Sequence, residues 1–170
     1  MKFRCERCGQ YHGVSEISLG ADAPGQWSIL TDAERAASIL TPDQCMIEAD
    51  GKSAWFIRGC LSVPIQHTDE EFTWGVWCSL SAKSHDEISQ HWDDPERIHL
   101  GPHFGWLSTA IPHYPDTMFM KTMVHHQAPG LRPLIILEPT DHPLSVDQRE
   151  GISSKRMKAI VESAFHDFDE

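Results

Sequence analysis

The first twelve residues contain the side chains with the most specific chemistry in the chain. Cys5 and Cys8 are separated by two residues, Gly9 follows the second thiol, and His12 lies three residues further on. Two thiolates at this spacing on one tight turn can bind a tetrahedral metal ion, and a histidine can supply a third ligand. The glycine lets the backbone turn so that amides point at sulfur. The spacing predicts half of a zinc knuckle, without the second CxxC or HxxxH pair that would complete it.

A fourth ligand has to come from a distant part of the chain, and three other cysteines are candidates. Cys78 shares a strand face with apolar neighbours, which indicates a buried thiol, and Cys60 follows a glycine at a bend. Cys45 lies in a loop predicted after a helix, where it can reach the N-terminal turn. We expect zinc as the cofactor, with the ligands Cys5, Cys8, His12 and Cys45. The alternatives are ordinary thiols, or a redox pair, which normally opens a helix after a strand.

Histidines gather in the second half of the chain. The sequence has 11 histidines, of which the late ones include His99, His103, His113, His125, His126 and His142. His99 and His103 have the spacing of a helical metal pair, but a Gly-Pro sequence between them breaks a helix. The adjacent His125 and His126 point to opposite faces of a strand and cannot bind one ion together. Each of them is expected to be a surface or capping residue.

The segment after the predicted strand 132–138 offers an alternative function. Asp141 and His142 could orient each other for acid–base catalysis, because loops at strand ends often carry sites. The proline- and glycine-rich loop 95–117 would form the wall of a pocket where other late histidines converge. This arrangement would make the chain a small hydrolase. The opposing interpretation is that Asp141 caps a helix.

Periodicity and capping patterns predict the elements that must position these side chains. Residues 1–30 are expected to form a hairpin around the CxxC that packs on the body of one domain spanning 1–170. Strands are expected at 53–65, with a bulge or bend at Gly59, and at 71–80, 104–108, 118–127 and 132–138. Helices are expected at 32–40 behind a capping box at Thr31, at 84–92 behind one at Ser84, at 143–150 and at 153–168.

The expected strands and helices are segregated along the chain, which predicts an α+β fold. The sheet should be mostly antiparallel, with about four or five strands and flanking helices, because most connections are short. The continuous apolar run Leu134 to Leu137 predicts a strand covered on both faces.

Charge and composition restrict the partners. The formal net charge is −11, which argues against binding to nucleic acid or to an anionic membrane, since phosphate binding needs an excess of lysine and arginine. The same charge fits a cationic protein partner. No run approaches the roughly 18 apolar residues of a membrane span. Five cysteines, an odd number, favour free thiols or metal ligands in a cytoplasmic protein over a disulfide framework.

Several short motifs, each weak alone, form a distinctive set. They are Cys5-x2-Cys8-Gly9-x2-His12, Asp43-Gln44-Cys45, Phe56-Ile57-Arg58-Gly59, Trp74-Gly75-Val76-Trp77, Phe104-Gly105-Trp106-Leu107 and Asp141-His142-Pro143-Leu144 through Gln148-Arg149-Glu150-Gly151-Ile152. The set resembles a family of uncharacterised bacterial proteins, domain of unknown function 2199. The resemblance implies a bacterial origin and a stand-alone domain, and it brings no established activity.

Two classes of function follow from these observations. The first is a non-catalytic binding module with a structural zinc ion at the N-terminal CxxC, of which an acidic inhibitor or immunity-type protein that binds a cationic protein is one version. The second is the small hydrolase that uses the late histidines and Asp141.

Overall fold

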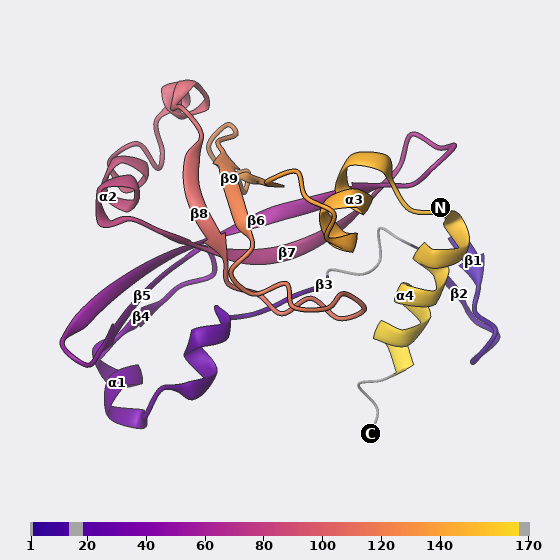
Figure 1. Cartoon of the computed structure of the whole chain (residues 1–170), viewed down its shortest axis with the longest axis horizontal. Coiled ribbons are helices and arrows are strands. Elements are labelled where there is room, and N and C mark those ends of the chain that lie inside the picture. The colour runs from indigo at the N-terminus through magenta and orange to yellow at the C-terminus, as the bar shows by residue number, and fades with distance from the viewer. Residues whose placement is uncertain (1, 14–18, 167–170) are drawn as a thin grey trace.

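Five strands in the middle of the chain close into a barrel (Figure 1). The computed structural model describes residues 2–13 and 19–166, with side chains as far as residue 164. The barrel strands are β6 (Lys52–Pro64), β7 (Glu71–Leu80), β8 (His103–Leu107), β9 (Lys121–His125) and β10 (Leu134–Leu137). Each strand pairs antiparallel with the next, and β10 then returns to pair parallel with β6 at Leu134 and Cys60.

This closure corrects the predicted sheet while the α+β class is confirmed. A closed meander with an odd number of strands must contain one parallel pair, because its first and last strands run in the same direction. The expectation of a mostly antiparallel sheet is therefore wrong, and the sheet is a mixed five-stranded barrel. A second parallel pairing joins the short strand β3 (Leu19–Gly20) to β7.

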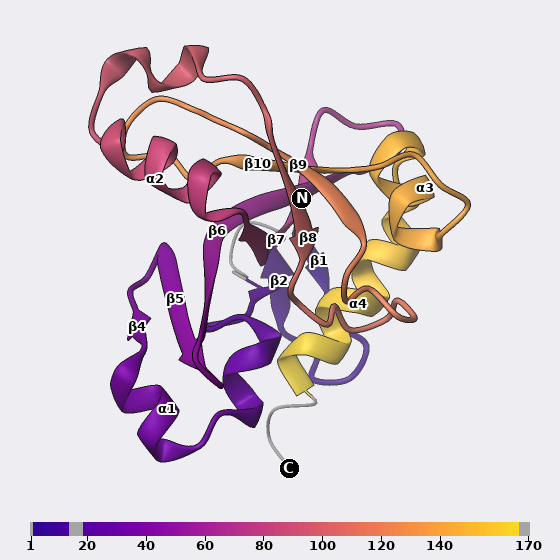
Figure 2. The ribbon, with the colours of Figure 1, turned by 60° about the vertical axis from the view of Figure 1, so that its left-hand side comes forward.

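Further strands extend the sheet on the other side of β6. The antiparallel neighbours are β5 (Gln44–Ala49), which pairs with the first half of β6, and β4 (Ile39–Leu40), which pairs with β5. Figure 2 shows β4, β5 and helix α1 (Asp32–Ala37) on the side of the barrel opposite to helices α3 (Pro143–Glu150) and α4 (Ser154–His166). The barrel therefore separates two peripheral layers of the molecule.

Two glycines allow the barrel strands to approach one another closely. At Gly59 a Cβ atom would lie 2.6 Å from the side chain of Ile135 in β10, and at Gly105 it would overlap the carbonyl oxygen of Ser79 in β7. The pairing of β6 with β7 runs unbroken through Gly59, so the predicted bulge is absent from this register. Gly59 marks the place where β6 exchanges its partner β5 for β10, as Cys60 N–H donates to Pro133 O at 2.8 Å.

The apolar side chains form two clusters, one on each face of the β6–β7 ladder. The larger cluster fills the barrel and the space beneath α3 and α4, and its members include Leu61, Val63, Val76, Leu107, Val124, Ile135, Leu144 and Met157. The smaller cluster lies on the opposite face and contains Cys45, Ile47, Phe56 and Trp77. The alternation predicted for 71–80 is confirmed for its first face, whereas Trp77 on the second face is buried as well.

Capping explains where the helices begin. Thr31 and Glu34 form the predicted capping box of α1, which ends at Ala37 because β4 follows. Helix α2 (Ala82–Gln90) begins earlier than predicted, because Ser81, and not Ser84, is its N-cap. The short helices η2 (Gly25–Ile29) and η3 (Pro95–His99) lie in segments predicted as loops. Gly151, at φ 79°, ends α3 as expected.

Strand β10 departs from its prediction in burial. Ile135 and Leu137 are buried, but Leu134 and Ile136 are 37% and 43% exposed. The strand is therefore covered on its barrel side and open on its outer side, and the expectation of cover on both faces is wrong.

The N-terminal hairpin packs beside the last helix. Strands β1 (Lys2–Arg4) and β2 (Tyr11–Gly13) pair antiparallel, as predicted for the residues around the CxxC, and they lie next to α4 (Figure 1). Phe3 enters the larger apolar cluster, and Lys158 of α4 lies over its ring at 5.6 Å. Among the described residues, no helix has the length and apolar character needed to cross a membrane.

Candidate metal centre

The hairpin turn brings the two thiols of the CxxC onto one loop. The carbonyl of Cys5 accepts a hydrogen bond from Gly9 N–H at 3.0 Å, and Cys5 N–H donates to Gln10 O at 2.8 Å. Gly9 has a φ of 72°, in the left-handed region where a glycine is preferred, so the turn depends on this residue. Phe3 in β1 lies opposite His12 in β2, which places the imidazole beside the turn.

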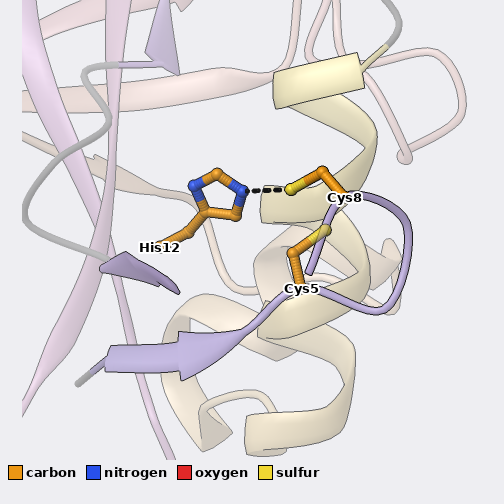
Figure 3. Close-up of side chains that lie close together, drawn as sticks. All are labelled: Cys5, Cys8 and His12. Atoms are coloured by element: carbon orange, nitrogen blue, oxygen red, sulfur yellow. Dashed lines mark hydrogen bonds between the residues drawn. The ribbon is translucent and has the colours of Figure 1, made fainter. Parts of the chain in front are cut away.

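The side chains of Cys5, Cys8 and His12 converge on one point (Figure 3). Their ligand atoms all lie within 4.8 Å of one another, and Cys8 Sγ is 3.2 Å from His12 Nε2. Sulfur and nitrogen ligands of a tetrahedral zinc ion lie about 3.5 Å apart and two sulfurs about 3.8 Å apart, given Zn–S and Zn–N bonds of about 2.3 and 2.0 Å. Arg7 N–H donates to Cys5 Sγ at 3.3 Å, so the backbone of the turn already contacts the sulfur. The donor set and its spacing could therefore hold a metal ion.

The three side chains differ in their access to solvent. Cys5 is only 2% exposed, His12 is half-buried and Cys8 is exposed. The loop is also tied to α4, because Glu6 N–H donates to Glu162 Oε1 at 3.0 Å. One side of the cluster thus rests on the protein and the other faces water.

Cys45 does not join this cluster. It lies on β5, on the side of the molecule opposite to the hairpin (Figure 1), and its side chain is buried in the smaller apolar cluster. Asp43-Gln44-Cys45 leads into a strand instead of a free loop, so pairing with β6 fixes the position of the thiol. Burial raises the pKa of Cys45 to about 11, which disfavours the thiolate that a metal ion binds. The cluster found among the described residues therefore has three of the four predicted ligands.

The residues of the hydrolase alternative do not form one site. His142 is the N-cap of α3: its Nδ1 accepts from Leu144 N–H at 3.1 Å, and its Nε2 donates to Pro115 O at 2.6 Å. The helix cap is therefore the histidine and not Asp141, which is exposed. Both imidazole nitrogens of His142 are used structurally, which leaves neither for acid–base work with Asp141.

The loop 95–117 does form part of a cavity wall, as predicted. A cavity of about 250 Å³ is lined by residues of β3, β7, α4 and the loop: Leu19, Gly20, Ala21, Trp74, Gly75, Val76, Thr109, Ala110, Ile111, Pro112, His113, Ser163 and Ala164. Of the late histidines only His113 is on this wall, and most of the other lining residues are apolar. A converging set of histidines and a carboxylate is missing from the lining residues.

A different histidine cluster lies at the end of the barrel beneath α2. His103 Nε2 is 3.0 Å from Glu87 Oε2, and its Nδ1 is 2.8 Å from His126 Nε2. Burial lowers the pKa of His126 to about 4, with the charges of His103 and Arg97 acting in the same direction. The sequence gives a weak signal for this chain of contacts, because Glu87 and His126 are 39 positions apart and are joined only through the closure of the barrel.

No curated protein and no solved structure matches the chain. A family model matches residues 4–152, a range that includes the hairpin turn, the barrel and α3. The chain therefore belongs to the family described as uncharacterized protein conserved in bacteria (DUF2199).

Proposed function

We propose that this protein is a non-catalytic binding module whose N-terminal hairpin is held in place by a structural zinc ion. Cys5, Cys8 and His12 supply three ligands, and the fourth comes from outside this group. The observation that carries the proposal is the convergence of the three ligand atoms within 4.8 Å on a turn whose amide already donates to sulfur.

A metal ion would stabilise the short N-terminal hairpin. Strands β1 and β2 have three residues each, and an isolated two-stranded hairpin is at best marginally stable in water. The binding energy of a structural zinc ion contributes directly to folding when the ligands are brought together only in the folded state. A zinc ion at this turn would hold Phe3 in the core and the loop against Glu162 of α4.

The binding role is supported by charge and by the absence of a converging acid–base site at the residues predicted for one. A net charge of −11 favours association with a cationic protein through long-range attraction. An inhibitor or immunity-type protein is one form that such a module would take.

The metal proposal is tested by elemental analysis of protein prepared without a histidine tag. We expect one zinc ion per chain by mass spectrometry in the unaltered protein, and none in the Cys5→Ser, Cys8→Ser double variant. A Cys60→Ser variant is the matched control, because it removes a half-buried thiol outside the hairpin and should keep its zinc. The double variant should also melt at a lower temperature, as the unaltered protein should after treatment with a chelator.

Cobalt substitution tests which atoms bind the metal ion and in what geometry. Co²⁺ at this site should give sulfur-to-metal charge-transfer absorption and the intense visible bands of a tetrahedral ion, and both should vanish in the double variant. Unaltered protein that holds no zinc, takes up no cobalt and melts at the same temperature with and without chelator would overturn the structural-metal proposal.

A further inference from the structure

The outer face of strands β8, β9 and β10 carries large apolar side chains that nothing covers among the described residues. On β8, Phe104 and Trp106 are 45% and 41% exposed, and on β10 Leu134 and Ile136 are exposed to a similar degree. Met123 of β9 lies between them and is half-buried. These five residues form the β8–β10 face.

The strand register makes the β8–β10 face continuous. Phe104 lies opposite Met123, and Met123 lies opposite Ile136, so three apolar side chains form a row across three strands. Trp106 extends the row along β8, where its ring contacts that of Phe104 edge-on at 5.2 Å. Residues two apart on a strand share a face, so Leu134 extends it along β10 in the same way.

The exposed apolar area of the β8–β10 face is large enough for a binding surface. The four most exposed side chains together present on the order of 300 Å² to solvent, which is comparable to the largest apolar patch of an ordinary monomer, and such patches often serve binding. Figure 1 looks onto β8 and β9 with no helix in front of them. The helices α3 and α4 cover other parts of the barrel, so the face is open in the described part of the chain.

Charges at one end of the face are mostly acidic. The segment of α2 and η3 that leads into β8 carries the acidic residues Asp86, Glu87, Asp93, Asp94 and Glu96. Its basic residues are Lys83 and Arg97, and Arg97 is buried, with its guanidinium bonded to backbone carbonyls. At the opposite end Lys121 is neutralised by Glu138 at 3.3 Å. The segment that leads into β8 therefore carries a net negative formal charge, although histidines lie against four of its carboxylates: Asp86, Glu87, Asp94 and Glu96.

We infer that the β8–β10 face is a docking surface for a protein segment that presents apolar side chains next to lysine or arginine. The apolar row would bury against the apolar side chains of the partner, and the acidic segment of α2 and η3 would attract its cations. A second copy of this chain fits less well, because it would bring the same acidic segment and a net charge of −11 to the interface. The inference rests on the proposed binding role but uses a face distinct from the metal centre.

Two synthetic amphipathic peptides serve as probes in fluorescence anisotropy. One has leucines on one helical face and lysines on the other, and its matched control has glutamates in place of the lysines. The unaltered protein should bind the leucine–lysine peptide more tightly, and rising salt should weaken that binding. The Phe104→Ser, Trp106→Ser double variant should lose roughly tenfold or more in affinity. An Ile29→Ser variant is the control, since Ile29 is an apolar residue of η2 that is 83% exposed.

Folding and zinc content are measured on the same samples, and an Ile136→Ser variant should repeat the loss of affinity from a different strand. Equal binding of both peptides, no binding of either, or an equal loss in the Ile29→Ser variant would overturn the inference. A dimer by sedimentation that the double variant converts to a monomer would also overturn it, because a second copy would then cover the face. Failure of the metal proposal would appear separately, as missing zinc with peptide binding intact.

Discussion

The five cysteines differ in how far their thiols are exposed to solvent. Cys8 is exposed at the hairpin turn, whereas Cys45 and Cys78 are buried within the sheet. Burial raises the pKa of Cys45 to about 11 and that of Cys78 to about 12, the latter against a small opposing effect of a hydrogen bond from Thr122. A thiol must ionise to react with an alkylating reagent, so reactivity should follow exposure and thiolate content.

This contrast gives a prediction for chemical labelling. In native protein treated with a chelator, iodoacetamide should modify Cys8 first, and Cys45 and Cys78 only after denaturation. Peptide mapping by mass spectrometry measures the order. Bound zinc should protect Cys8, so the same experiment in the presence of zinc is the control. Rapid native labelling of Cys45 would contradict the buried position that separates it from the hairpin.

Arg97 is a buried cation that is held by carbonyl oxygens. It is 2% exposed, and its guanidinium donates to Trp92 O, Gln127 O, Ala128 O and Leu131 O at 2.7–3.0 Å. The guanidinium also lies over the ring of Trp92, at 4.9 Å from its centroid. One side chain thus joins the segment after α2 to the loop between β9 and β10.

Replacement of Arg97 by methionine should destabilise the protein strongly. The four carbonyls would lose their donors, and the expected loss in the free energy of unfolding is on the order of 3 kcal/mol. Arg97→Lys should recover only part of this loss, because an ammonium group cannot reproduce the planar fork of donors. Urea denaturation measures both variants. A loss below about 1 kcal/mol for Arg97→Met would show that water replaces the guanidinium without penalty.

At the scale of elements, the chain of contacts from α2 to the barrel depends on an uncharged His126. Its ordinary pKa of 6.5 falls to about 4 in the folded protein, through burial first and then through His103, Arg97 and His125, against the opposing effect of Glu87. Between these two values the unfolded chain binds a proton that the folded protein does not. His126 therefore carries no penalty for the folded protein above pH 6.5, and the folded protein is destabilised progressively as the pH falls from 6.5 to the folded pKa near 4.

The free energy of unfolding should therefore decrease as the pH falls from about 6.5 to 4. The part due to His126 should be about 1–2 kcal/mol, because solvent screens a half-buried group. A His126→Gln variant should show a weaker dependence on pH across this window, and the exposed His99, which is not among the groups that shift His126, provides the control variant His99→Gln. Denaturation curves at several pH values measure the free energy of unfolding of each variant. Identical slopes for both variants would exclude His126 as the titrating group.

Local patterns in the sequence predict the elements well where a side chain acts on its own backbone. Thr31 and Glu34 predict where α1 begins, and Gly151 predicts where α3 ends, because capping depends on only a few neighbouring residues. The burial of β10 could not be predicted in this way. Its four apolar residues suggest cover on both faces, and only the tertiary arrangement leaves Leu134 and Ile136 open.

At the scale of the whole molecule, barrel closure explains which site residues could be predicted. Cys5, Cys8 and His12 belong to one hairpin, so their spacing along the chain is enough to bring them together. Cys45 was expected to join them from a loop, but pairing of β5 with β6 holds it on the far side of the barrel. The contacts of His103 with Glu87 and His126 arise from the same closure of the barrel. Local sequence patterns cannot predict this closure.

The attachment of the hairpin to α4 has a consequence for the order of events during protein synthesis. Glu6 and Glu162, which are hydrogen-bonded, are 156 positions apart, so the hairpin emerges from the ribosome long before its docking site exists. A nascent chain therefore carries the CxxC turn undocked until residues as far as Glu162 have been made. Thiols in that position meet metal ions, or oxidants, before the rest of the protein can shield them. Under the structural-zinc proposal, a metal ion bound at the turn during translation would be in place before the hairpin docks on α4.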